Sequence, residues 1–390
     1  MRCVERVLNF FKPLIQTSLP APSWYSGRLW LMKLGYYKLH AQKTQAMDWI
    51  WIVDHSVQLG SDKCFVILGV RASSLKEDLT LSMEDVEPIT LSPVKTSNGE
   101  VVYQELVNSI SKTGIPMAIV GDKGSDLNLG VTKFCNETGT IYIHDVKHKV
   151  ALLLKKNFEQ DINWKSFTEL AAKTQKHTQQ TKIAGAAPPT QRSKARYMNI
   201  EALVKWGQNM LNILEKGIPE EWDKDLFEMK IGWVKFYKQD IEKWKNMMSF
   251  AITTESLIRK SGISIGITDI LKQEFMKLNF CPASALFGNE LLASVMQEEL
   301  KVKIGQILIG SSEILEALFG KFKDIEDVQS KSGFTGLSLV IPALAAKTTI
   351  KIIHAAMEVV KVIDLKNWFD NNIGQSVQSQ RVMFRDYAAT

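Results

Sequence analysis

Cysteine is scarce in this chain of 390 residues, which contains only four. They are Cys3, Cys64, Cys135 and Cys281. They lie far apart and no two form a CxxC pair, which argues against a zinc module and against a disulfide framework. Scattered thiols are typical of proteins that work in a reducing compartment. We therefore expect a cytoplasmic protein.

Long hydrophobic runs are also lacking. No window approaches the ~18 uncharged apolar residues of a transmembrane helix. The N-terminus carries charges at Arg2, Glu5 and Arg6 and has no compact apolar core before a small-residue cleavage site, so a secretory signal is not expected. The composition, 45% hydrophobic and 23% charged, is ordinary for a globular protein. We expect no membrane partner.

A strong excess of one charge is absent as well. The net charge of +6 permits a polyanionic partner without requiring one. Basic residues are concentrated between Lys155 and Arg196, where nine Lys or Arg stand against three acids. A solvated helix face is the more common meaning of such a run, and DNA contact is the alternative. For that alternative the candidate DNA-binding residues are Arg192, Lys194 and Arg196.

Apolar runs of strand length begin at Trp49. Trp49–Val53 and Cys64–Val70 are continuous apolar runs around the turn residues 60–62, which predicts an antiparallel pair buried on both faces. Val86–Val94 is a third strand candidate, and its two prolines predict a position at the sheet edge. Met117–Val120 and Thr140–Ile143 are two further short strands.

Helical signals separate the later strands. Ser97 is followed three residues later by Glu100, a pattern typical of a capping box that opens a helix, and a second helix is expected through Leu127–Phe134. The order β-β-β-α-β-α-β is that of the RNase H-like fold. We therefore predict an α/β protein with an RNase H-like mixed five-stranded sheet, a large all-helical insertion and a helical C-terminal tail.

The same patterns divide the chain into five parts. They are an N-terminal helical flank with a basic aromatic stretch (1–46), the first part of the core (47–149), the helical insertion (150–308), a core helix that carries an acid (309–332) and the C-terminal helical tail (333–390).

Two aspartates come at the ends of predicted strands. Asp54 ends the first strand and Asp122 follows the fourth. Phosphodiester cleavage with Mg²⁺ requires carboxylates from distant segments to hold two cations ~4 Å apart. Rigid strand ends provide such anchors, so both are candidate catalytic metal ligands. An isolated Asp after a strand is otherwise a turn residue, and Asp126 is an alternative that can also cap the next helix, with Ser125 as its rival.

The third carboxylate is expected on a late helix that begins near Glu313. Glu313 and Glu316 lie on its polar stripe, together with Lys323. Glu313 is in the first turn, where the helix dipole favours an acid without any function, so we favour Glu316. Gly320 leaves room for a substrate on the same face, and Lys321 and Lys323 are candidate phosphate contacts.

Asp145 and His148 form the remaining candidate pair. They lie three residues apart at a strand-to-helix junction and can hydrogen-bond or assist near a metal. The alternative is that they are satisfied structural groups.

At these residues the sequence resembles the DDE transposases of bacterial insertion sequences, particularly a group common in cyanobacteria and planctomycetes. The resembling segments are Asp48–Ser56 with Lys63–Arg71, Ile119–Gly130, Ile143–Lys149, Gln191–Asn199 and Ser311–Lys323. Asp54 and Asp122 match the two aspartates of that family, and Glu316 with Lys323 matches a glutamate followed seven positions later by lysine. Asp145-x-x-His148 is similar to a Cys/Asp-x-x-His motif of several transposase superfamilies.

The resemblance implies an activity and its partners. It implies cleavage at transposon ends and strand transfer into target DNA, with two Mg²⁺ ions that Mn²⁺ can replace, and it makes a homodimer plausible. The chain departs from the family because no convincing helix-turn-helix precedes the core. The element that recognises the transposon ends is therefore unassigned. Two alternatives remain: an RNase H-like nuclease that cuts without joining, and an inactive remnant that binds DNA.

Overall fold

The computed structural model describes residues 2–12, 20–59, 62–94, 96–191, 198–326, 336–373, 385 and 387. The chain forms two compact units. One unit, here called the core unit, combines residues 1–145 with 308–390, and the other, the inserted unit, consists of residues 146–307.

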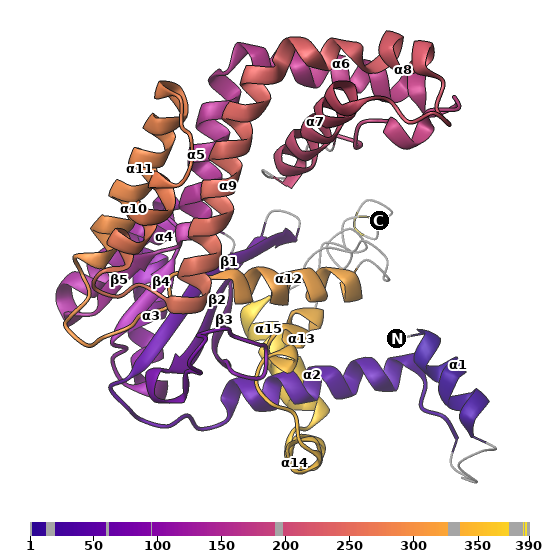
Figure 1. The fold of residues 1–390 in the computed structure, drawn as a ribbon. Coiled ribbons are helices and arrows are strands. Elements are labelled where there is room, and N and C mark those ends of the chain that lie inside the picture. The colour runs from indigo at the N-terminus through magenta and orange to yellow at the C-terminus, as the bar shows by residue number, and fades with distance from the viewer. Residues whose placement is uncertain are drawn as a thin grey trace. The chain divides into compact units, whose positions relative to one another are not determined.

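A five-stranded sheet is the centre of the core unit (Figure 1). Its strands are β1 (Trp49–Leu59), β2 (Asp62–Arg71), β3 (Glu87–Val94), β4 (Ala118–Gly121) and β5 (Ile141–His144). The order across the sheet is β3-β2-β1-β4-β5. The pairs β1–β2 and β2–β3 are antiparallel, whereas β1–β4 and β4–β5 are parallel. This mixed sheet confirms the predicted RNase H-like fold class, and β3 with its two prolines lies at an edge as expected.

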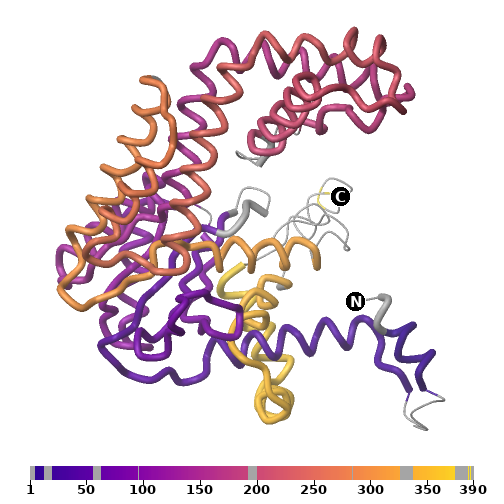
Figure 2. The backbone as a smooth tube through the Cα atoms, viewed as in Figure 1, coloured from indigo at the N-terminus to yellow at the C-terminus, as the bar shows by residue number. Residues whose placement is uncertain are grey.

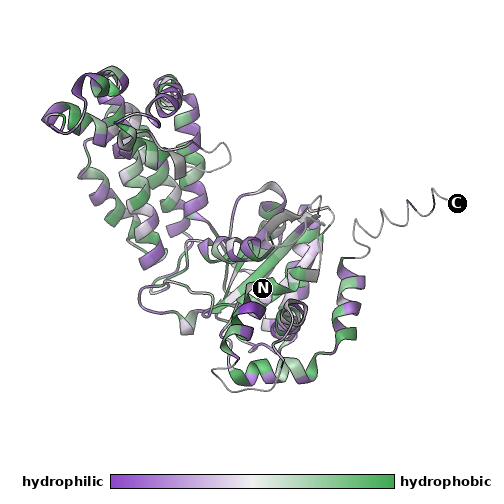
Figure 3. Cartoon of the chain, turned by 90° about the vertical axis from the view of Figure 1, so that its right-hand side faces the viewer, coloured by the Kyte–Doolittle hydropathy of each residue, from purple (hydrophilic) through white to green (hydrophobic). Residues whose placement is uncertain are grey.

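The first strand is longer than its apolar run predicts. Trp49–Val53 is completely buried, as a central strand covered on both faces requires. Figure 3 shows a long strand of the sheet that is largely green, hence hydrophobic. β1 continues to Leu59 as one arm of a hairpin with β2. The prediction that Asp54 ends the strand is therefore wrong. The apolar run stops at Val53 because the pairing with β4 stops at Ile52, not because the strand stops.

One face of the sheet is covered by α3 (Gly99–Thr113) and α4 (Ser125–Thr138). Their apolar residues pack with the side chains of β1 at Trp49, Trp51 and Val53. The capping box predicted at Ser97 is wrong, because Asn98 is the N-cap of α3 and accepts a hydrogen bond from the Val101 amide at 3.0 Å. The N-cap of α4 is Gly124, so neither Ser125 nor Asp126 caps that helix.

The remaining helices of the core unit come from both ends of the chain. They are α1 (Arg2–Phe11), α2 (Trp24–His40), α12 (Glu313–Glu326), α13 (Val340–Leu344), α14 (Ile350–Val359) and α15 (Val362–Asn372). α2 packs against α13 and α14, and α12 contacts β1 (Figure 1). The buried Lys38 ammonium joins α2 to the C-terminal segment, donating to the carbonyls of Ala343, Ala345 and Ala346.

The inserted unit is helical wherever the structure describes it in regular elements (Figure 2). Its α-helices are α5 (Val146–Gln160), α6 (Ile162–Thr178), α7 (Met198–Lys216), α8 (Lys224–Ile231), α9 (Lys238–Ser261), α10 (Ile267–Met276) and α11 (Pro282–Glu299). Phe167 is completely buried and its ring contacts those of Trp164, Trp206, Trp233 and Trp244. These tryptophans therefore belong to the hydrophobic core of the inserted unit. In the described part of the chain no helix is long and apolar enough to cross a membrane.

Candidate active site

Three aspartates lie at one edge of the sheet. Asp54 comes two residues after Ile52, the last residue of β1 that pairs with β4. Asp122 directly follows β4, and Asp145 directly follows β5. Because β1, β4 and β5 run parallel, the points at which their mutual pairing ends lie at the same edge. In open α/β sheets, ligands bind outside this carboxyl edge.

Close approach of backbone shapes the position of Asp122. A Cβ added to Gly121 would lie 2.9 Å from Cγ2 of Val53 and 3.2 Å from its carbonyl oxygen, so only glycine permits this spacing between β4 and β1. The carboxylate of Asp122 accepts a hydrogen bond from the Gly124 amide at 2.8 Å. Its carbonyl accepts one from the Tyr142 hydroxyl at 2.5 Å.

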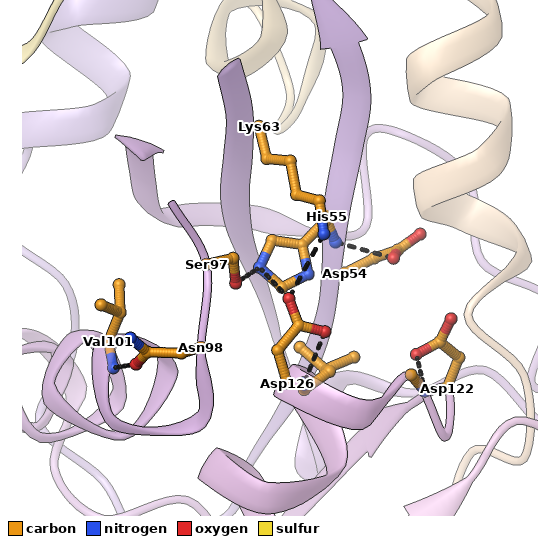
Figure 4. Close-up of polar contacts among 10 residues, drawn as sticks. Asp54, His55, Lys63, Ser97, Asn98, Val101, Asp122 and Asp126 are labelled. Atoms are coloured by element: carbon orange, nitrogen blue, oxygen red, sulfur yellow. Dashed lines mark hydrogen bonds and ion pairs between the residues drawn. The ribbon is translucent and has the colours of Figure 1, made fainter. Parts of the chain in front are cut away.

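Asp54 is exposed to the negative charges of three other acids. Its side chain is half-buried and accepts a hydrogen bond from the His55 amide at 2.7 Å (Figure 4). Burial raises the pKa of Asp54 to about 7, and the negative charges of Asp122, Asp145 and Glu316 raise it further against the opposing effect of that hydrogen bond. A carboxyl group responds in this way when like charges are close by. Asp54, Asp122 and Glu316, three of the predicted site residues, therefore share one region with Asp145.

Glu316 reaches this region from α12, which contacts β1. Consecutive residues of a strand point to opposite faces of a sheet, so Asp54 faces away from Val53 and from the α3–α4 layer. Glu316 is half-buried, as is Glu313, the first residue of the same helix. Further along α12, Gly320, Lys321 and Lys323 are exposed.

Asp145 is buried and bonded to the residue that precedes α12. Its carboxylate accepts hydrogen bonds from the backbone amide of Ser312, at 3.1 Å, and from the Ser312 hydroxyl. The Asp145 amide donates to the carbonyl of Gly121 at 2.9 Å. Sequence reasoning placed Asp145 near the site but missed Ser312. No local pattern links two residues so far apart in the chain.

Asp126 belongs to a different cluster. Its carboxylate lies 3.4 Å from the Lys63 ammonium and 3.9 Å from Nε2 of His55, and Figure 4 shows it directed toward them, apart from Asp54 and Asp122. Burial alone would raise the pKa of Asp126, but the Ser97 hydroxyl, the charge of His55, the Leu127 amide and Lys63 together lower it to about 2. Asp126, the alternative to Asp122, is therefore placed elsewhere, and its carboxylate is already paired with the Lys63 ammonium.

The cluster of Ser97, His55 and Asp126 is not a hydrolytic triad. Ser97 Oγ lies 2.8 Å from Nε2 of His55, and Asp126 approaches the same nitrogen. A triad requires the nucleophile and the acid on opposite ring nitrogens of the histidine. Burial lowers the pKa of His55, although the charge of Asp126 opposes this. We assign these residues to the packing of β1 against α3 and α4.

The other predicted residues lie in or beyond the inserted unit's first helix. His148 is in the first turn of α5 and is half-buried. Arg192, Lys194 and Arg196 lie outside the described residues.

The acids can be compared with what a divalent metal requires. Mg²⁺ prefers carboxylate oxygens, so the donor set of Asp54, Asp122 and Glu316 is chemically suitable. Among the residues that the structure describes, no three His, Cys, Asp or Glu side chains lie close enough together to hold a metal ion. In this structure, Asp54, Asp122 and Glu316 are therefore not gathered around one point as the ligands of a single ion.

Comparisons with known proteins give a likeness to solved structures. No family model matches the chain, and no curated protein matches it. Among solved structures, the chain is similar to the Drosophila P element transposase strand transfer complex, with 13% sequence identity and a TM-score of 0.45 over 90% of this chain and 92% of that chain.

Proposed function

We propose that this protein is a metal-dependent polynucleotidyl transferase that acts as a DDE-type DNA transposase. The observation that carries the proposal is the placement of Asp54 on β1, Asp122 directly after β4 and Glu316 on α12, which contacts β1, at the carboxyl edge of an RNase H-like sheet. The charges of Asp122 and Glu316 help to raise the pKa of Asp54. A structural role explains the burial of Asp54 beside other acids poorly, because a carboxylate that is removed from water near like charges destabilises a fold. Perturbed carboxyl groups of this kind are typical of functional sites.

Asp54, Asp122 and Glu316 would hold two Mg²⁺ ions, which Mn²⁺ can replace. Bound there, the ions would make a water or a 3′-hydroxyl a better nucleophile and stabilise the charge on the leaving oxygen. A metal would require these carboxylates in their ionised form, so its binding would favour loss of the Asp54 proton. Asp54 lies on β1 and Asp122 directly follows β4, so the sheet would anchor the backbone of both residues, and their side chains would turn toward a bound ion.

The DNA would lie along the exposed side of α12. Gly320 carries no side chain there, and a Cβ added to it would meet nothing within 4 Å. Lys321 and Lys323 are exposed on the same helix and can contact phosphates as point charges. Both transposon-end DNA and target DNA are partners in this proposal, and processing of two ends favours a homodimer.

The direct test is cleavage of oligonucleotides that carry the ends of the DNA element encoding the protein. We expect cleavage and strand-transfer products with Mg²⁺ or Mn²⁺, none with EDTA, and none from Asp54→Ala or Asp122→Ala. Asp126→Asn is the matched control and should retain both products. Cleavage without strand-transfer products would indicate that the protein is a nuclease and not a transposase. DNA binding without any cleavage would overturn the catalytic assignment.

A further inference from the structure

A buried hydrogen-bonded contact joins the two segments of the core unit across the insertion. Asp145 is the last core residue before the inserted unit, and Ser312 comes five residues after Ile307, where that unit ends. The two residues are 167 positions apart in sequence and only 4% and 5% exposed. We call this contact the Asp145–Ser312 clamp.

The clamp lies between two predicted metal ligands. On one side, the Asp145 amide bonds the carbonyl of Gly121, the residue before Asp122. On the other side, the Ser312 carbonyl accepts from the Leu315 amide at 2.9 Å and so closes the first turn of α12. Glu316 is the next residue. A continuous series of hydrogen bonds therefore runs from the end of β4, through Asp145 and Ser312, to the turn that carries Glu316.

The chemistry of the clamp favours a fixed geometry. A carboxylate that is removed from water requires strong hydrogen-bond donors, and Ser312 supplies two. The first turn of a helix has unsatisfied amides and a partial positive charge, which favours an anion there. Asp145, from a different part of the chain, thus accepts the hydrogen bonds of the donors at the start of α12. Moving α12 along or about its axis would separate a buried charge from its donors.

We propose that Asp145 is a positioning residue, which sets the place of Glu316 relative to Asp54 and Asp122 through Ser312. This assigns Asp145 a role other than that of metal ligand. The inference rests on the proposed function for the meaning of that geometry, but the geometry can be tested without DNA.

The test compares Ser312→Ala with the conservative Ser312→Thr. Removing the hydroxyl leaves the backbone donor in place, so the core should still fold. We expect Ser312→Ala to weaken Mn²⁺ binding, measured by electron paramagnetic resonance, on the order of tenfold, and to speed hydrogen exchange in residues 313–318. We expect kcat for Mg²⁺-dependent cleavage to fall by a similar factor with KM for DNA unchanged. Ser312→Thr should have wild-type Mn²⁺ affinity, hydrogen exchange in residues 313–318 and kcat.

Ser109→Ala is the matched control, because it removes another buried hydroxyl of the core unit. Ser109 lies 2.7 Å from the Thr90 hydroxyl and far along α3 from its start. The Ser109→Ala variant should have a lower melting temperature but unchanged Mn²⁺ affinity and kcat. If Ser312→Ala does not fold, Asp145→Asn replaces it in the comparison, because asparagine has the same shape as aspartate.

Three outcomes are informative. Positioning is refuted when Ser312→Ala lowers the melting temperature as Ser109→Ala does, but leaves Mn²⁺ affinity and kcat at wild-type values. It is supported when affinity and kcat fall together and threonine restores them. When the wild-type protein cuts no DNA, but Ser312→Ala still loosens α12 and weakens Mn²⁺ binding, the clamp stands and the transposase assignment fails.

Discussion

Replacing Asp54 with asparagine should stabilise the metal-free protein above neutral pH. The folded protein raises the pKa of Asp54 from 3.8 to about 7, through burial first and then the charges of Asp122, Asp145 and Glu316. Between these two values the unfolded chain releases the proton while the folded chain retains it. The stability that protonated Asp54 contributes is therefore fully present below pH 3.8 and is lost as pH rises through about 7. Asparagine has no proton to lose and can still accept the hydrogen bond from the His55 amide.

The size of the effect follows from that interval. A difference of about 3 pKa units at about 1.4 kcal/mol each gives up to about 4 kcal/mol. We expect the free energy of unfolding of Asp54→Asn to exceed that of the wild type by an amount of this order at pH 8 and by almost nothing at pH 4. The measurement is guanidinium unfolding in EDTA at both pH values, with hydrogen exchange of the β1 amides as the probe of the core unit.

Asp126→Asn should behave in the opposite way. The pKa of Asp126 is lowered to about 2, so its carboxylate contributes stability above pH 3.8 that is lost as pH falls through about 2. The same chemical change should therefore destabilise the protein at pH 8 by about 2 kcal/mol. An Asp54→Asn protein that is less stable than the wild type at pH 8, as Asp126→Asn should be, would refute the raised pKa of the Asp54 carboxyl in the folded protein.

Other predictions concern metal, DNA and packing. Mg²⁺ at 100 times its dissociation constant should stabilise the wild type by about 2.7 kcal/mol and should not stabilise Asp54→Ala, as measured by thermal unfolding. Gly320→Ala should stabilise α12 by about 1 kcal/mol, because its Cβ enters open space; Gly320→Trp should lower cleavage without lowering the melting temperature. Replacing Lys321 and Lys323 together by alanine should weaken binding to all DNA sequences and reduce the salt dependence by about two phosphate contacts, as seen in a salt titration. Lys38→Met leaves buried carbonyls without a donor and should destabilise the core unit by about 1–3 kcal/mol, with faster hydrogen exchange in α14.

The sequence predicts the architecture of the core unit well, for a physical reason. A central strand buried on both faces must be a continuous apolar run, and Trp49–Val53 is such a run. The prolines of β3 have no amide to donate, which places that strand at the edge. The order of strands and helices then leaves few ways to connect them.

The details depend on contacts that no local pattern records. Asp54 is predicted to end its strand because polarity begins there, yet polarity marks only the end of pairing with β4. Ser97 and Asn98 are both good N-caps, and the contact of Ser97 with His55 leaves the role to Asn98. Ser312 meets Asp145 across the whole inserted unit.

The most direct measurement of the central claim is Mn²⁺ binding, followed by electron paramagnetic resonance, to the wild type and to single alanine variants of Asp54, Asp122 and Glu316. If the three acids form one metal site, each variant weakens binding strongly, while Asp126→Asn binds as the wild type does. Wild-type affinity in the Glu316→Ala variant would contradict the claim that this acid completes the site.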